Sequence, residues 1–213
     1  MKITKESKWA TPMFHDNIAD QPIVDELLAL IEEQRIADKC KFTHSTGNAE
    51  DIIEEFFKSE HPTIVEFREC WVMPWVNNML LNTYGRLYDN IQLFGWVNYF
   101  KNNTCVTVHH HDNKLLTGCF YLQTYQKAPG GHIIHHDPRF NFNMNNFSQT
   151  PEKDTHVFHL PKRGDLVMFP CYVWHETTPW GHEIGPFKET VCDTGTDTEE
   201  KRINICWDVY GNA

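Results

Sequence analysis

From about residue 90 onward the sequence breaks into short apolar segments separated by Gly, Pro and Asn, which narrows the fold to a sheet-rich architecture. Short apolar segments bounded by turn residues are typical of β-strands. We predict strands near residues 92–100, 104–110, 116–123, 131–136, 156–160, 165–170, 172–175 and 202–210. Many short strands with few helical runs between them indicate an antiparallel jelly roll or barrel.

The first 90 residues have helical periodicity instead. Asp20 is a suitable N-cap for one helix, and Asn48 is a suitable N-cap for a second. Thr63-x-x-Glu66 has the form of a capping box that opens a third helix, which Pro74 should kink or split. Helices followed by strands indicate an α+β protein in which the helices pack on one outer face of the sheets.

The chain length and the absence of an evident linker favour a single domain over residues 1–213. The chain contains no repeat, low-complexity tract or Gly/Ser linker that would divide it. We therefore predict a helical support region at 1–90 and a jelly-roll core at 91–213. Within the core, the Asn-rich residues 140–155 are typical of a long loop, and the acidic residues 182–200 are typical of a solvated insertion.

Charge and hydropathy argue against two classes of partner. The formal net charge is −10, from 19 Lys and Arg against 29 Asp and Glu, so we expect no nucleic-acid partner. No apolar run is long enough to cross a bilayer and the N-terminal residues lack an apolar signal core, so we expect no membrane segment and a cytoplasmic location. Seven cysteines without a CxxC pair are typical of reduced thiols in such a location.

Histidine is concentrated in one part of the chain, since ten of the 13 His lie between residues 109 and 182. Strand alternation places His109 and His111 on one face, from which both can reach a single metal ion. His110 and Asp112 form a rival pair on the opposite face. A site between strands also needs a ligand distant in sequence, and His175 is the candidate, although a single buried His is more often satisfied by hydrogen bonds.

The choice between the two pairs depends on strand register. A carboxylate would complete the common site of two His and one carboxylate, which favours the pair of His110 and Asp112. Val106 and Val108 are apolar and should face the packed side of the strand. His109 and His111 then lie together on the opposite face, which favours this pair. Strand register thus favours His109, His111 and His175 as the metal ligands and catalytic residues, with Asp112 as an outer hydrogen-bond acceptor or a turn residue, and the choice between His111 and Asp112 as the third ligand stays open from the residues alone.

Arg202 opens the apolar final strand, where a charge is rare unless it is paired. A buried Arg requires an anion, which is either a protein carboxylate or a bound dicarboxylate. We derive no role for a further group of histidines, and a solvent-exposed strand position is the simpler interpretation for most of them: His132, His135, His136, His156 and His159.

Together these residues resemble the non-haem Fe(II)- and 2-oxoglutarate-dependent oxygenases, in particular a prolyl-hydroxylase-like branch of bacteria and phages. The matching motifs are spread over most of the chain, in the family's order: Trp9-Ala10-Thr11-Pro12, Trp96-x-Asn98, His109-x-His111-x-Asn113, Thr117-Gly118-x-x-Tyr121, Asp137-Pro138-Arg139, Lys162-Arg163-Gly164-Asp165-Leu166-x-x-Phe169-Pro170, His175 and Arg202. The resemblance implies a double-stranded β-helix, that is, a cupin-like jelly roll. It also implies Fe(II) and 2-oxoglutarate as cofactors, with O₂ as cosubstrate.

The resemblance also suggests roles for the cofactor-binding residues. Arg202 matches the Arg that pairs with the distal carboxylate of 2-oxoglutarate. Thr117 and Tyr121 resemble hydroxyl donors of the same pocket, and Tyr99 matches a tyrosine near the iron-bound end. The chain departs from the commonest family pattern, His-x-Asp, because its own register reads His109-x-His111.

Three functions remain open from the sequence. The first is a 2-oxoglutarate-dependent dioxygenase, a prolyl-4-hydroxylase-like hydroxylase of a peptide or small molecule that releases succinate and CO₂. The second is a cupin-like three-His metal enzyme without 2-oxoglutarate, which would have no need of a buried cation at Arg202. The third is a non-catalytic jelly-roll binding protein.

Overall fold

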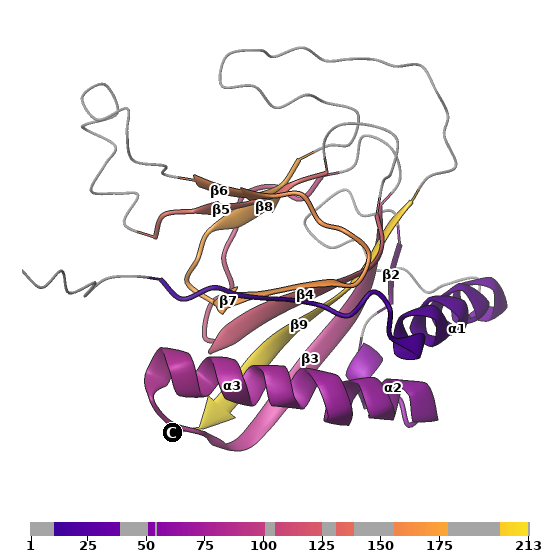
Figure 1. Ribbon diagram of the computed structural model, residues 1–213, viewed down its shortest axis with the longest axis horizontal. Coiled ribbons are helices and arrows are strands. Elements are labelled where there is room, and N and C mark those ends of the chain that lie inside the picture. Colours follow the sequence, from indigo (N-terminus) through magenta and orange to yellow (C-terminus); the bar gives the residue numbers. More distant parts are fainter. Residues whose placement is uncertain are drawn as a thin grey trace, which may run out of the picture.

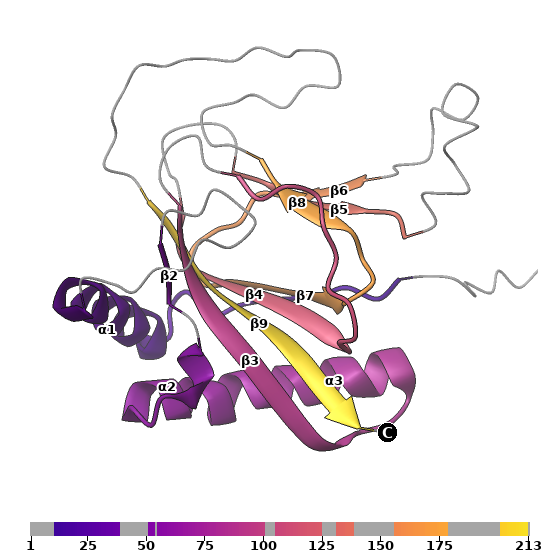
Figure 2. The ribbon, with the colours of Figure 1, turned by 180° about the vertical axis from the view of Figure 1, so that it is seen from behind.

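Two antiparallel sheets face each other, and helices cover the outer side of the larger sheet (Figures 1 and 2). The computed structural model describes residues 11–38, 51–53, 55–100, 105–124, 131–138, 156–178 and 201–212. The larger sheet has the strand order β1 (Phe14–Asn17), β7 (Asp165–Pro170), β4 (Leu116–Gln123), β9 (Arg202–Asn212), β3 (Asp89–Phe100) and β2 (Asp51–Ile53). The smaller sheet has the order β6 (His156–His159), β5 (Ile133–His136) and β8 (His175–Thr177).

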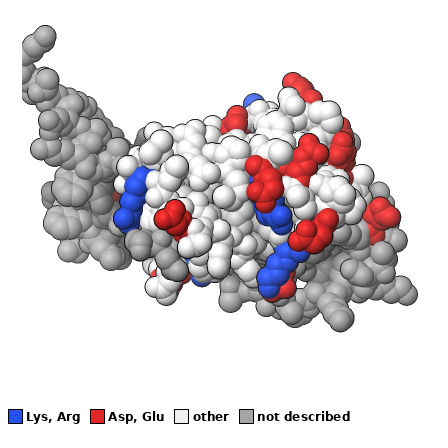
Figure 3. Space-filling model, turned by 90° about the horizontal axis from the view of Figure 1, so that it is seen from below, with Lys and Arg blue, Asp and Glu red and all other residues white. Residues whose placement is uncertain are grey.

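The helices are α1 (Pro22–Asp38), the 3₁₀ turn η1 (Phe56–Lys58), α2 (Pro62–Glu66), the π-helical turn η2 (Phe67–Val72) and α3 (Met73–Tyr84). In Figure 1 α2 and α3 run beneath the larger sheet. Among the described residues, no helix has the length and apolar character that a membrane span requires. On the helical side, seen in Figure 3, acidic and basic side chains alternate in small groups, without the continuous basic area of a nucleic-acid binder on the described part of that face.

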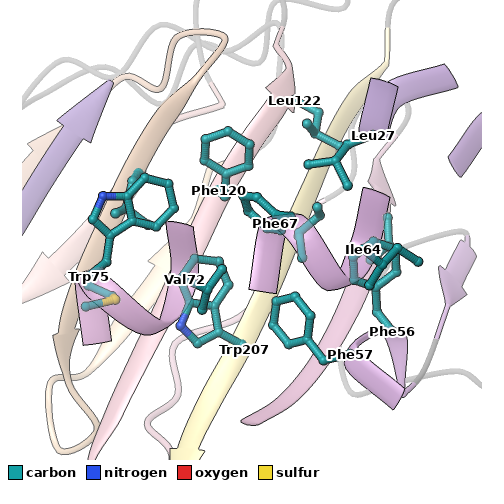
Figure 4. Packing of buried hydrophobic residues seen from close by; sticks show 14 of the residues in the cluster. Leu27, Phe56, Phe57, Ile64, Phe67, Val72, Trp75, Phe120, Leu122 and Trp207 are labelled. Atoms are coloured by element: carbon teal, nitrogen blue, oxygen red, sulfur yellow. The ribbon is translucent and has the colours of Figure 1, made fainter. Parts of the chain in front are cut away.

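The main core lies between these helices and the larger sheet, and it is rich in aromatic rings (Figure 4). The ring of Phe67 lies at its centre, with centroids 5.1 Å from Phe120, 6.1 Å from Trp75 and 6.5 Å from Trp207. Contacts of this kind add about 0.5–1.5 kcal/mol per pair beyond the burial of apolar area. This core fixes one face of the larger sheet and leaves the other face for the space between the sheets.

Alternation along β9 separates the two faces clearly. Ile203, Ile205 and Trp207 are buried in the core on the helical side. The residues between them therefore point toward the smaller sheet: Arg202, Asn204, Cys206 and Asp208. Because an apolar strand rarely carries charge, the two charged residues of this inner face mark it as the place to look for a site.

Several predicted elements are confirmed, and others are wrong. The helix after Asp20 and the strands at 116–123 and 165–170 are present, and the combination of helices with antiparallel sheets agrees with the predicted α+β class. Of the described residues in 104–110, only His109 makes a β-bridge. The strand predicted at 172–175 begins instead at His175.

The helical region also differs from the prediction. Ile52 and Ile53 belong to the short strand β2, which pairs with β3, and not to a helix; their β-branched side chains suit a strand. The third helix is capped by His61, whose Nδ1 accepts from the Thr63 N–H at 3.3 Å, so the predicted capping box is wrong. The helix is not split at Pro74: it changes to a π-helical turn, η2, and continues into α3, where Pro74 lies in the first turn.

Gly118 provides a test of the packing of this core. A Cβ atom at Gly118 would lie 2.3 Å from Cε2 of Trp207, whose side chain is fully buried and opposite it in the β4–β9 register. Gly118→Ala is therefore expected to lower the free energy of unfolding by about 1–3 kcal/mol or more in denaturant titrations. Gly211→Ala is the matched control, because its nearest neighbour is the flexible end of Leu115, at 2.9 Å. Equal losses in the two variants would contradict the packing.

Candidate metal centre

Three histidines from two segments distant in sequence meet between the two sheets. His109, His111 and His175 each offer one ring nitrogen, and these atoms lie within 4.8 Å of one another. Backbone hydrogen bonds hold the segments together: His109 and His175 exchange two, at 2.9 and 2.8 Å, and the His111 N–H donates to the Cys171 carbonyl at 3.1 Å. Among the described residues, this is the one group of three that meets the geometry for a metal ion.

Each of the three rings has its Nδ1 next to a hydrogen-bond acceptor. His109 Nδ1 lies 2.8 Å from the Thr107 carbonyl, and His175 Nδ1 lies 3.1 Å from the Val173 carbonyl. His111 Nδ1 lies 2.8 Å from Oδ1 of Asp208. A carbonyl can only accept, so the proton belongs on Nδ1 and the lone pair on Nε2 is left available, and a carboxylate favours the same tautomer at His111. Three available imidazole nitrogens form a donor set that suits a first-row transition metal such as iron.

Burial keeps two of these imidazoles, His109 and His175, in the ligating form. The pKa of His175 lies well below its usual value, first because of burial and second because of the neighbouring His109. Burial also lowers the pKa of His109, and the hydrogen bond to Thr107 partly opposes this effect. Both rings are therefore neutral at neutral pH, as metal binding requires.

The rival pair lies outside this group. His110 Nδ1 lies 3.3 Å from Asp112 Oδ1, but the Asp112 side chain is 81% exposed. The ring of His110 packs at 4.2 Å against the ring of Trp174. The structure thus brings His109 and His111 to His175, although one premise of the prediction was wrong, because Val108 is 48% exposed and not on a packed side. The expected role of Asp112 as an outer acceptor is not seen, since Asp208 occupies that place.

Arg202 and the two β4 residues predicted to bind the cofactor lie on the inner face. Arg202 is 1% exposed, its guanidinium carbon lies 4.2 Å from the Phe100 ring centroid, and Nη1 donates to the Gly131 carbonyl at 2.9 Å. Tyr121 is fully buried, and burial raises the pKa of its hydroxyl well above the usual value. Thr117 donates from Oγ1 to Oδ1 of Asp208 at 3.0 Å.

Tyr99 is not brought to this group. Its side chain is buried in the core on the helical side, and its hydroxyl donates to the Ile31 carbonyl at 3.1 Å. Alternation along β3 places its neighbours Asn98 and Phe100 on the inner face instead. The sheet itself therefore separates Tyr99 from the three histidines.

Sequence reasoning missed three residues of the inner face, Asp208, Asn204 and His135. The sequence did indicate Asp208 and Asn204. Side chains alternate between the two faces of a strand, so residues an even number of positions after Arg202 share its face. Asn204 is buried, and its Oδ1 has no hydrogen-bond partner among the described residues, as is also true of the hydroxyl of Tyr121. Unsatisfied buried polar atoms of this kind are expected where a polar ligand binds.

The interpretation of the remaining strand histidines as solvent-exposed is wrong. Each of the five is buried or half-buried: His132, His135, His136, His156 and His159. His136 Nε2 lies 3.0 Å from Glu176 Oε1, and His159 Nε2 lies 3.2 Å from Asp165 Oδ2. Three other sequence features lie outside the described residues: Arg139, the Asn-rich stretch 140–155 and the acidic stretch 182–200.

His135 should make the protein without metal sensitive to acid. It is 2% exposed, neither ring nitrogen has a partner among the described residues, and burial lowers its pKa to about 3, with His15 and His159 adding to the effect. The unfolded chain, with a usual pKa, takes up the proton first as the pH falls. Stability is therefore complete above about pH 6.5 and falls by about 1.4 kcal/mol per pH unit below it, until the folded pKa is reached.

Denaturant titrations of the metal-free protein between about pH 6.5 and pH 5 test this expectation. The His135→Phe variant, with a ring that can pack against Phe169, should show a shallower fall in unfolding free energy than the native chain. Parallel pH dependences in the two proteins would mean that His135 is not held neutral by burial.

The comparisons with known proteins agree with this chemistry. A family profile described as "Putative 2OG-Fe(II) oxygenase" matches residues 95–184, the segment that contains all three histidines. No curated protein matches the sequence at a significant level.

The fold is shared with solved structures of related chemistry. A Pseudomonas putida prolyl-4-hydroxylase matches with a TM-score of 0.62 and 12% identity, over 95% of this chain and 94% of that one. The non-haem α-ketoglutarate-dependent epimerase SnoN from nogalamycin biosynthesis matches with a TM-score of 0.62 and 12% identity, over 94% and 79%. HygX from Streptomyces hygroscopicus, with nickel and 2-oxoglutarate bound, matches with a TM-score of 0.56 and 9% identity, over 95% and 83%.

At such low identities the neighbours establish the fold, and the profile match adds the family chemistry. The profile description names 2-oxoglutarate and Fe(II), which confirms the cofactors predicted from the sequence at the level of the family. The family match over residues 95–184, the shared fold and the three-His group together support membership of the non-haem Fe(II)- and 2-oxoglutarate-dependent oxygenase superfamily.

Proposed function

We propose that this chain is an Fe(II)- and 2-oxoglutarate-dependent hydroxylase that converts 2-oxoglutarate, O₂ and a substrate C–H group to succinate, CO₂ and the hydroxylated substrate. The observation that carries the proposal is the convergence of three imidazole nitrogens on the same inner surface that holds the buried Arg202. A three-His site alone fits several metal enzymes, but a buried cation on the same inner surface is suited to bind a dicarboxylate.

His109, His111 and His175 would hold the iron through Nε2. Iron bound in this way leaves open positions, at which it supplies O₂ activation. The protein's own part is to orient the three rings, which the Nδ1 contacts accomplish, and to keep His109 and His175 neutral, which their burial accomplishes. These ligand roles follow from donor geometry and do not depend on the choice of substrate.

Arg202 would bind the distal carboxylate of 2-oxoglutarate through its planar guanidinium fork. Its stacking on Phe100 and its bond to Gly131 hold the group in one orientation, so little side-chain entropy is lost when the carboxylate binds. The Tyr121 hydroxyl and the Asn204 amide oxygen offer further polar contacts on the same surface. We assign the two facing sheets to a double-stranded β-helix, with the helices as its support.

The three-His donor set also favours a second candidate, a cupin-like metal enzyme that does not use 2-oxoglutarate. Arg202 distinguishes the two, because the first uses its guanidinium to bind 2-oxoglutarate and the second does not require it. A peptide containing proline is the first substrate to test, given the shared fold with a prolyl-4-hydroxylase. The test of the proposal is Fe(II)-dependent formation of succinate from 2-oxoglutarate, without a substrate and then with proline-containing peptides and small molecules.

A further inference from the structure

We propose that Asp208 is a positioning residue of the metal centre, which supplies through His111 the negative charge that the three-His site lacks. This inference rests on the proposed function. Sites with two His and one carboxylate place a negative charge directly on the iron, whereas three neutral imidazoles leave the centre one unit more positive. Asp208 places a carboxylate one hydrogen bond away from the metal position.

The contact is specific to one of the three histidines. Oδ1 of Asp208 lies 2.8 Å from His111 Nδ1, while the Nδ1 atoms of His109 and His175 face neutral backbone carbonyls. A carboxylate that accepts from the rear nitrogen of a ligating imidazole makes the other nitrogen a stronger donor. His111, which stands where many relatives of this chemistry carry a carboxylate, is thus the ligand that acquires anionic character.

Asp208 is held firmly for this task. It is 5% exposed, and Thr117, its direct partner in the β4–β9 register, donates to the same Oδ1 at 3.0 Å. The His111 ring is fixed from other directions as well, since it stacks on Trp96 at a centroid distance of 6.1 Å and its backbone bonds to Cys171. Neither partner has to move for the carboxylate to act.

A metal ion held by His111 would also explain why the Asp208 carboxylate is buried. A buried carboxylate costs several kcal/mol unless a cation compensates it. The contacts that the structure shows for Asp208 are a hydroxyl and an imidazole, and a divalent metal on the far side of that imidazole provides the missing positive charge. The alternative is a purely structural ion pair between Asp208 and a protonated His111, which would compete with metal binding.

The two interpretations predict opposite effects of Asp208→Asn, which keeps the size and one acceptor oxygen but removes the charge. As a positioning residue, Asp208→Asn should weaken Fe(II) or Co(II) binding by about 10- to 100-fold, and Asp208→Ala should weaken it further because the acceptor is also lost. As a structural ion pair, the substitution would leave metal affinity unchanged or raise it. Chelator-competition titrations of the full chain measure this affinity.

A spectroscopic signature separates this role from a loss of folding. When Fe(II) and 2-oxoglutarate bind without O₂, the metal-to-ligand charge-transfer band should move to higher energy in Asp208→Asn, because the iron has lost electron density. Asp112→Asn is the matched control, since it removes an exposed carboxylate close by that pairs only with His110 among the contacts shown, and it should change neither affinity nor band. Thermal unfolding of the metal-free variants records stability separately.

An unchanged metal affinity and an unchanged band in Asp208→Asn, beside a native protein that binds iron and 2-oxoglutarate, would overturn the inference while leaving the proposed function intact. A native protein that binds no metal would instead overturn both. A weakened affinity together with the shifted band, absent in Asp112→Asn, would establish the positioning role.

Discussion

His175→Ala is expected to abolish stoichiometric iron binding and, with it, 2-oxoglutarate turnover. The native chain should hold about one equivalent of iron at neutral pH, because the imidazoles of His109 and His175 are neutral there. Loss of one of three ligands should weaken binding more than the roughly 10- to 100-fold typical of outer contacts, so elemental analysis should find almost no iron in the variant. The backbone bonds between His109 and residue 175 do not involve the side chain and should survive.

His110→Ala is the matched control for this experiment. It removes the same kind of side chain from the same segment, but that side chain packs on Trp174 and pairs with Asp112, away from the three-His group. Iron content should therefore remain near one equivalent. Undiminished iron in His175→Ala, or loss of iron in His110→Ala, would show that the metal is bound by a different set of ligands.

Arg202→Ala is expected to weaken 2-oxoglutarate binding by roughly tenfold to a hundredfold or more. Each charge-assisted hydrogen bond to the distal carboxylate contributes about 1.5–3 kcal/mol, and about 1.4 kcal/mol corresponds to a factor of ten. Arg202→Lys should restore only part of the affinity, since an ammonium group lacks the planar fork. Anaerobic titration of the iron-loaded protein measures the 2-oxoglutarate dissociation constant directly.

Arg86→Ala serves as the control, because Arg86 also lies over an aromatic ring, Tyr88 at 4.6 Å, but is exposed on the surface. Iron content should be the same in the native chain and in each Arg variant. If 2-oxoglutarate affinity is untouched in Arg202→Ala, the buried cation serves a protein carboxylate, and the three-His enzyme without 2-oxoglutarate becomes the better account.

Much of the site could be predicted because its residues form short motifs within single strands. Two His at i and i+2 followed by Asp or Asn, a distant His at the end of a predicted strand and an Arg at the head of an apolar strand are all visible in the sequence. The strand predicted at 116–123 has the same bounds as β4. Alternation then places Thr117 and Tyr121 on the inner face.

The features that sequence reasoning missed depend on contacts between distant segments. Ile52 and Ile53 fit a helical face as well as a strand, and pairing with β3 decides the matter. Tyr99 was assigned by its spacing from His109, but the core contact with Ile31 sets which face it occupies. Asp208 lies 97 positions from His111 in the numbering, so only the fold can show their hydrogen bond.

Succinate formation from 2-oxoglutarate by iron-loaded protein in air tests the central claim most directly. The native chain should release succinate above a metal-free control even without a substrate, and His175→Ala should not. Arg202→Ala should need a much higher 2-oxoglutarate concentration to reach the same rate. A native protein that holds about one equivalent of iron but forms no succinate, alone or with proline-containing peptides and small molecules, would contradict the assignment.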